Sequence, residues 1–159
     1  MGVPPEGGLS HVDARGRASM VNVTAKPPTH RVARATCSVR MSAPGWELLR
    51  DASAGAEIVS TARSAGLVAG KRAAAVIPLC HPIRIDSIAV EVALGGSAVS
   101  ITATVETVER TGVEMEALAA CAGAALAIVG AVLPVDPDVR VDDLVVAHKS
   151  GGRSGTWNR

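Results

Sequence analysis

Apolar residues recur at every second position in several stretches of the chain, which is the pattern of strands with one buried face. The first stretch is His30–Met41, the next two are 88–94 and 99–106, and the last is 139–147. Gly95-Gly96 separates the middle two, so we expect a hairpin there.

The segments between these strands have apolar residues at helical spacing. Trp46–Arg50 predicts a short helix, and the alanine-rich stretch Glu57–Ile77 predicts a longer one that Pro78 ends. Another long helix is expected from Val113. The order strand, helix, strand, strand, helix, strand (β-α-β-β-α-β) predicts an α+β fold of the ferredoxin-like type, with helices packed on one face of an antiparallel sheet.

These elements divide the chain into three parts. Residues 1–29 are expected to be mostly irregular, because Pro27-Pro28 stops regular structure. Residues 30–149 should form a single α+β domain. Residues 150–159 are a glycine-rich phosphate-loop tail, expected to be mobile without ligand. Met1–Ser10 contains no apolar stretch, so no signal peptide is expected.

The second long helix should contain 19 residues without a charge, Ala117–Val135. That is close to the length of a membrane span, but eight of the 19 are alanine and the flanks are acidic rather than basic or aromatic. One apolar stripe at helical spacing consists of Leu118, Ala122, Leu126, Val129 and Leu133. A neighbouring stripe of small residues consists of Ala117, Ala120, Ala124, Ala127 and Ala131. Small residues let a helix approach its neighbours closely, so we expect a core helix and no membrane contact.

Composition narrows the class of protein. With 159 residues, 48% hydrophobic and 19% charged, the chain suits one globular domain. A net charge of +1 and only two aromatics, Trp46 and Trp157, argue against a nucleic-acid partner. Cys37, Cys80 and Cys121 lie far apart without a C-x-x-C, so neither a disulfide framework nor a metal site is expected. A cytoplasmic location is the simplest setting.

Three segments carry candidate chemistry. His81, between Pro78 and Pro82, is either a turn residue bonded to the backbone or a pre-positioned acid or base. Its neighbour Cys80 is expected to be merely buried.

The other two segments are polar and flank the long helix. Thr111 and Glu114 fit a capping box, whereas Glu116 has no place in that box and is as open to a functional role as to a solvated one. The tail from His148 to Gly155 combines glycines, cations and hydroxyls, which is typical of phosphate-binding loops or of a solvated tail.

Together the segments resemble the cyclic pyranopterin monophosphate synthase family of molybdenum cofactor biosynthesis. The matching stretches follow the family's order and are Leu9–Asp13, Met20–Val23, Thr61–Gly66, Lys71-Arg72, Ile77–Pro82, Thr111–Leu118 and Lys149–Gly155.

The resemblance implies a ferredoxin-like subunit in a homo-hexamer, a trimer of dimers, with the site between subunits. It implies a lyase without cofactor or metal that converts a cyclised dihydro-GTP to cyclic pyranopterin monophosphate and pyrophosphate. His81, Glu114 and Lys149 would be catalytic. Substrate contacts would come from Leu79, Cys80, His81, Met115, Glu116, Lys71 and Arg153, with Arg31 and Arg63 as weaker candidates.

The chain departs from the family's pattern at four positions. The family's catalytic Asp and the Lys three residues later fall on Gly130 and Leu133. A further family lysine falls on Gly55, and an early Asp falls on Asn22. Losing one such group typically costs about 10²–10⁴ in rate.

These departures leave alternatives open. One is a working lyase in which Glu57, Asp136 or Lys71 substitutes for a lost group. Another is a non-catalytic paralogue that acts as a binding or assembly partner, mixed into hexamers with an active relative. A remote third is an unrelated regulatory domain, in which the His81 and Lys149 segments would have no purpose.

Overall fold

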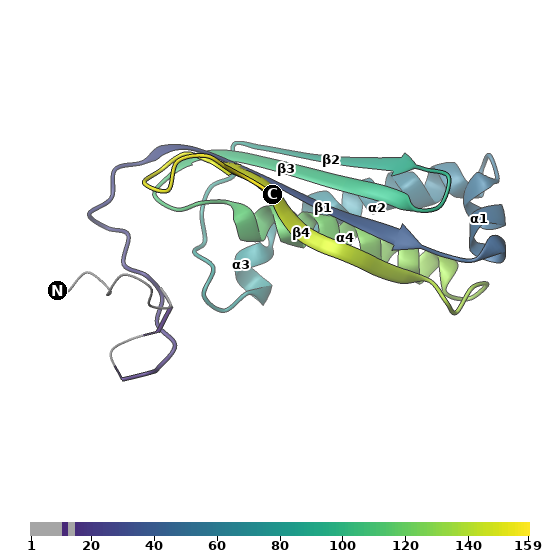
Figure 1. The fold of residues 1–159 in the computed structure, drawn as a ribbon, viewed down its shortest axis with the longest axis horizontal. Coiled ribbons are helices and arrows are strands. Elements are labelled where there is room, and N and C mark those ends of the chain that lie inside the picture. Colours follow the sequence, from purple (N-terminus) through teal and green to yellow (C-terminus); the bar gives the residue numbers. More distant parts are fainter. Residues whose placement is uncertain (1–10, 13–14) are drawn as a thin grey trace.

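The computed structural model describes residues 11–12 and 15–159 and has two layers, a sheet above and helices below (Figure 1). The sheet is antiparallel, with five strands in the order β2-β3-β1-β4-β5. Helices α2 and α4 pack on one of its faces. The order of the first four strands is that of a ferredoxin-like fold, so the predicted fold class is confirmed.

The elements follow the predicted order, with boundaries shifted by a few residues. The strands are β1 (Thr29–Arg40), β2 (Ser87–Leu94), β3 (Val99–Glu109), β4 (Arg140–Ser150) and β5 (Trp157–Asn158). The helices are α1 (Ala43–Arg50), α2 (Ala54–Lys71), α3 (Ala73–Val76) and α4 (Glu114–Val132). The helix predicted over Glu57–Ile77 is therefore two helices, interrupted at Arg72.

The C-terminal tail, expected to be mobile, lies against the sheet as β5. Gly151, Gly152 and Gly155 have positive φ angles, which glycine adopts at low cost, and they turn the chain back along β4. Beyond β5, the Arg159 backbone N–H donates to the Ala147 carbonyl over 2.9 Å.

The N-terminal segment is irregular where the structure describes it. Its described residues before β1 hold one isolated bridge, between Val12 and Ala18. Met1–Ser10, where no signal peptide was expected, lies outside the described residues.

Helix α4 packs through its small residues. Ala117, Ala120 and Ala124 are fully buried, so the predicted small-residue stripe is confirmed as a packing surface. The larger stripe is only partly exposed: Leu126 is 64% and Leu133 51% exposed, whereas Leu118 and Val129 are half-buried against the core. By length and composition α4 could cross a membrane, but one side of it belongs to the core and the other is an exposed apolar face.

Candidate active site

The candidate site lies at the end of the sheet where α4 begins. Strand register places Ala33, Lys149 and Trp157 in one row across β1, β4 and β5. Ala33 is fully buried in the core, so this row is on the face that the helices cover. Glu114, the first residue of α4, meets the row where its Oε1 lies 3.4 Å from the Lys149 Nζ.

A cavity of about 1130 Å³ opens around this ion pair. The N-terminal segment, the start of β1, the loop before β2, the start of α4 and the tail all contribute to its wall. Its Lys and Arg residues are Lys26, Arg31, Arg110, Lys149 and Arg153. Among the described residues, two carboxylates, Glu114 and Glu116, line the same cavity. The cavity therefore has an excess of positive charge, which favours an anionic ligand.

Glu116 is a buried carboxylate on the cavity wall, only 4% exposed. The Cys80 Sγ donates a hydrogen bond to its Oε1 over 3.2 Å. Burial raises the pKa of Glu116, although hydrogen bonds from its own backbone N–H and from Cys80 oppose the shift. Burial, followed by the hydrogen bond to Glu116 and its negative charge, raises the pKa of Cys80 to about 12. Cys80 is thus a protonated donor at neutral pH, rather than merely buried.

His81 makes the backbone hydrogen bond that one interpretation predicted, and it lies at the candidate site. Its Nε2 lies 2.9 Å from the carbonyl oxygen of Val21, and the residue also lines the cavity. A carbonyl oxygen only accepts hydrogen bonds, so Nε2 carries a hydrogen and Nδ1 is the basic nitrogen of the neutral ring. The bond also ties the N-terminal segment to the loop before β2.

The capping box predicted for Thr111 and Glu114 is not formed. Helix α4 begins at Glu114 itself, with Val113 at the N-cap and no side-chain cap. The Thr111 hydroxyl donates to the Gly112 carbonyl over 3.2 Å. Glu114 pairs instead with Lys149, a residue of strand β4.

Arg31 joins the glycine-rich tail to the site. Its Nη1 donates to the Gly151 carbonyl over 3.5 Å and its Nη2 to the Arg110 carbonyl over 3.4 Å. Its Nε is buried and has no hydrogen-bond partner among the described residues. A Cβ on Gly152 would overlap the Arg31 guanidinium. Arg31 therefore supports the tail at the point where the tail faces the cavity.

The structure brings most of the predicted site residues together. Those that line the cavity are Leu79, Cys80, His81, Glu114, Met115, Glu116, Lys149, Arg153 and the weaker candidate Arg31. Arg63 and Lys71 are exposed on α2 and do not line it. Lys26, Arg110 and Trp157 line it but were not predicted, because a single cation or aromatic outside a motif gives no sequence signal.

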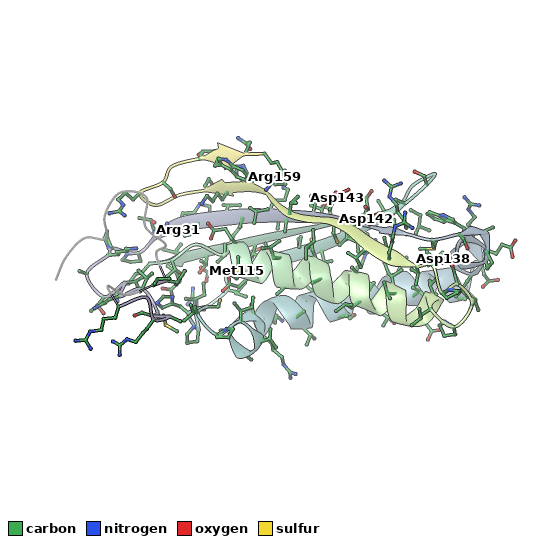
Figure 2. The ribbon with its side chains drawn as sticks, turned by 60° about the horizontal axis from the view of Figure 1, so that its bottom comes forward. Arg31, Met115, Asp138, Asp142, Asp143 and Arg159 are labelled. Atoms are coloured by element: carbon green, nitrogen blue, oxygen red, sulfur yellow. The ribbon has the colours of Figure 1, made fainter. Side chains whose placement is uncertain are left out.

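Gly130 and Leu133 lie at the other end of the molecule. Gly130 is about four helical turns beyond Met115, or about 22 Å at the rise of an α-helix. Figure 2 shows Arg31 and Met115 at one end of α4 and Asp138, which follows the helix, at the other. A Cβ on Gly130 would meet nothing within 4 Å, so a larger residue fits there.

Gly55 lies at this far end too, because α2 and α4 are antiparallel. A Cβ on Gly70, near the end of α2, would lie 3.2 Å from the backbone oxygen of Glu116 at the start of α4. Gly55 is at the opposite end of α2, and a Cβ there would overlap the Leu49 carbonyl. A lysine at this position therefore requires the backbone between α1 and α2 to move.

Of the three candidate substitutes, Asp136 is held by hydrogen bonds to the backbone. Asp136 is 1% exposed, and its Oδ2 accepts from the Ser42 backbone N–H over 2.6 Å while its Oδ1 accepts from Asp138 over 3.1 Å. Burial would raise the pKa of Asp136, but these backbone donors hold it below its ordinary value. Asp136 thus fixes the start of α1. Neither Glu57 nor Lys71 lines the cavity of the described chain.

Comparison with known proteins shows what the chain is similar to. A protein of Thermomicrobium roseum called cyclic pyranopterin monophosphate synthase is 45% identical over 154 residues, covering 95% of this chain and 93% of that protein. The protein of that name from Streptomyces coelicolor is 43% identical over 159 residues, covering 99% and 94%.

Mycobacterium bovis has two such relatives, called synthase 2 and synthase 1, which are 44% and 43% identical and cover 96% and 95% of this chain. Each is covered over at least 90% of its own length. The model of the MoaC family matches residues 20–152. The chain belongs to the MoaC family.

Proposed function

We propose that this chain is a cytoplasmic cyclic pyranopterin monophosphate synthase, a lyase that converts a cyclised dihydro-GTP to cyclic pyranopterin monophosphate and pyrophosphate. The observation that carries the proposal is that one cavity with excess positive charge contains two polar pairs. Lys149 forms an ion pair with Glu114, and Cys80 donates a hydrogen bond to Glu116. Relatives that bear this name over nearly their full length support it.

Each group has a role that suits this substrate. Lys149 and Arg153 bind the triphosphate, because Lys and Arg supply charge and donors to phosphate oxygens. Nδ1 of His81 and the carboxyl group of Glu116 exchange protons during ring rearrangement, because both residues line the cavity and both groups can donate and accept a proton. The protonated thiol of Cys80 donates a hydrogen bond and does not act as a nucleophile.

We infer that the working form is a homo-hexamer in which one copy completes the cavity of another. The outer apolar stripe of α4 supports a contact between copies, because an exposed apolar face of this kind is typical of protein interfaces. Antiparallel pairing of two α4 helices about a two-fold axis would place Leu133 of one copy beside Met115 of the other. The far end of α4 would then close the partner's cavity.

A second candidate function is that of a non-catalytic partner mixed into hexamers with an active paralogue. The specific observation in its favour is that Gly130 and Leu133, at the family's Asp and Lys positions, hold no charge. Mycobacterium bovis, with two numbered relatives, shows that one organism can contain two such proteins. In a mixed dimer this chain would supply Glu114, Glu116 and Lys149, and the paralogue would supply the charged helix end.

Pyrophosphate release from the cyclised substrate distinguishes the two functions. Wild type is compared with Gly130→Asp/Leu133→Lys, in which both new side chains start from exposed positions. The synthase proposal predicts release by wild type and faster release, by about 10², in the double variant. Substrate binding without release by wild type, with release regained in the double variant, would establish the non-catalytic partner instead.

Mixing tests whether the site is shared between copies. The variant Lys149→Ala/Gly130→Asp/Leu133→Lys has the charged helix end but lacks the cavity lysine. Coexpressed with wild type, it should yield hexamers with higher turnover than either protein alone. Turnover no greater than the average of the two would show that the far end does not reach a partner's cavity.

A further inference from the structure

Trp157 is the single Trp, Tyr or Phe on the cavity wall of the described chain, which also carries the imidazoles of His11 and His81. The sequence contains no Phe or Tyr and only one other Trp. That residue, Trp46, is 8% exposed and lies in α1, away from the cavity. A planar ligand in the cavity therefore has one large aromatic ring to stack on, the indole of Trp157.

The tail holds the Trp157 ring in place. Trp157 pairs with Lys149 across β4 and β5, and side chains of directly opposed residues emerge on the same face with Cβ atoms about 5 Å apart. On the other face, the His148 Nδ1 lies 2.8 Å from the Asn158 Oδ1. The Arg159 guanidinium carbon lies 5.6 Å from the Trp157 ring centroid. Trp157 remains 39% exposed, so part of this fixed ring is accessible from the cavity.

We propose that Trp157 binds the heterocycle of the substrate by stacking, with the phosphates of the same ligand on Lys149 and Arg153. This deepens the proposed function and rests on it. Stacking on an aromatic face suits a planar purine-derived ring and needs no hydrogen-bond match. The pairing of Trp157 with Lys149 places a ring surface and a cation side by side, which is the combination that a nucleotide-like ligand requires.

Fluorescence of Trp157 tests the proposal without turnover. In a Trp46→Phe background Trp157 is the sole tryptophan, and GTP and inorganic tripolyphosphate serve as probes with and without a ring. GTP should quench the fluorescence on binding, whereas tripolyphosphate should bind with little quenching. Trp157→Leu should lower the affinity for GTP roughly tenfold, measured by calorimetry, and leave the affinity for tripolyphosphate within about twofold of wild type.

Trp157→Phe is the matched variant, because it keeps a ring at the same place in β5 and should retain most of the GTP affinity. Equal losses for both probes in Trp157→Leu would show that the residue only shapes the tail. That result, or no loss for either probe, would overturn the stacking role and leave the proposed reaction standing. Failure of wild type to bind either probe would overturn the anion-binding cavity and the stacking role together.

Discussion

The thiol of Cys80 lies 3.2 Å from Oε1 of Glu116 and joins the loop before β2 to the first turn of α4. Both groups line the cavity. Burial, and then the nearby Glu116 carboxylate, raise the pKa of Cys80 and keep the thiol protonated. The contact thus determines which proton donor the site contains.

Cys80 should react slowly with iodoacetamide at pH 7.5, since with a pKa of about 12 almost none of it is thiolate. Glu116→Gln removes the carboxylate charge, so the pKa of Cys80 should fall and alkylation should accelerate by about tenfold or more. Peptide mass spectrometry gives the rates. Cys37 and Cys121 are buried and act as internal controls that label only on unfolding. Equal rates in the two proteins would contradict this account of Cys80.

Ionisation of Glu116 should destabilise the folded protein as pH rises. Its pKa in the folded protein is raised above the ordinary value of 4.5, mainly by burial. The folded state therefore binds this proton more tightly than the unfolded state. The free energy of unfolding falls as pH rises from the pKa of the unfolded state to the higher pKa of the folded state. Gln cannot ionise, so the Tm of Glu116→Gln should gain on that of wild type as pH rises above about 4.5, by a few degrees. A difference in Tm that does not change with pH would show that Glu116 is not perturbed.

Gly152→Ala should weaken anion binding, because the new Cβ overlaps the Arg31 guanidinium that supports the tail. Gly155→Ala is the matched control: both glycines have positive φ, +69° and +64°, but a Cβ on Gly155 meets nothing within 4 Å. Tripolyphosphate affinity, measured by calorimetry, should fall about tenfold in Gly152→Ala and much less in Gly155→Ala. Equal losses would attribute the effect to backbone strain alone.

Leu126→Lys should disrupt the oligomer, because it places a charge in the outer stripe of α4, where Leu126 is 64% exposed in the single chain. Val76→Lys is the control, at a residue of α3 that is 74% exposed and outside that stripe. Analytical ultracentrifugation should show smaller species for Leu126→Lys only. Unchanged assembly in both variants would show that the outer side of α4 is not part of the interface.

Local patterns in the sequence predicted the sheet well. Alternation over His30–Met41 and the Gly95-Gly96 turn correspond to β1 and the β2–β3 hairpin. They did not predict β5, which exists because a two-residue strand finds its partner on β4. Two residues are too short to show alternation, so the position of Trp157 on the cavity wall was not predictable.

The site was predicted only in part, because local motifs are visible in the sequence whereas contacts between distant residues are not. The loop with His81 and the tail with Lys149 carry recognisable motifs, and the structure brings them together in one cavity. The capping box was wrong because Glu114 pairs with Lys149, which is distant in sequence. Which stripe of α4 faces the core was likewise undetermined, since a helix rich in alanine is apolar on both sides.

Pyrophosphate release by the purified wild-type protein, compared with Lys149→Ala in the same assay, tests most directly whether this cavity carries out the reaction. The account predicts release from the cyclised dihydro-GTP by wild type and a loss of about 10²-fold or more in Lys149→Ala. Saturable binding of that substrate to wild type, with release no greater than that of Lys149→Ala, would contradict it.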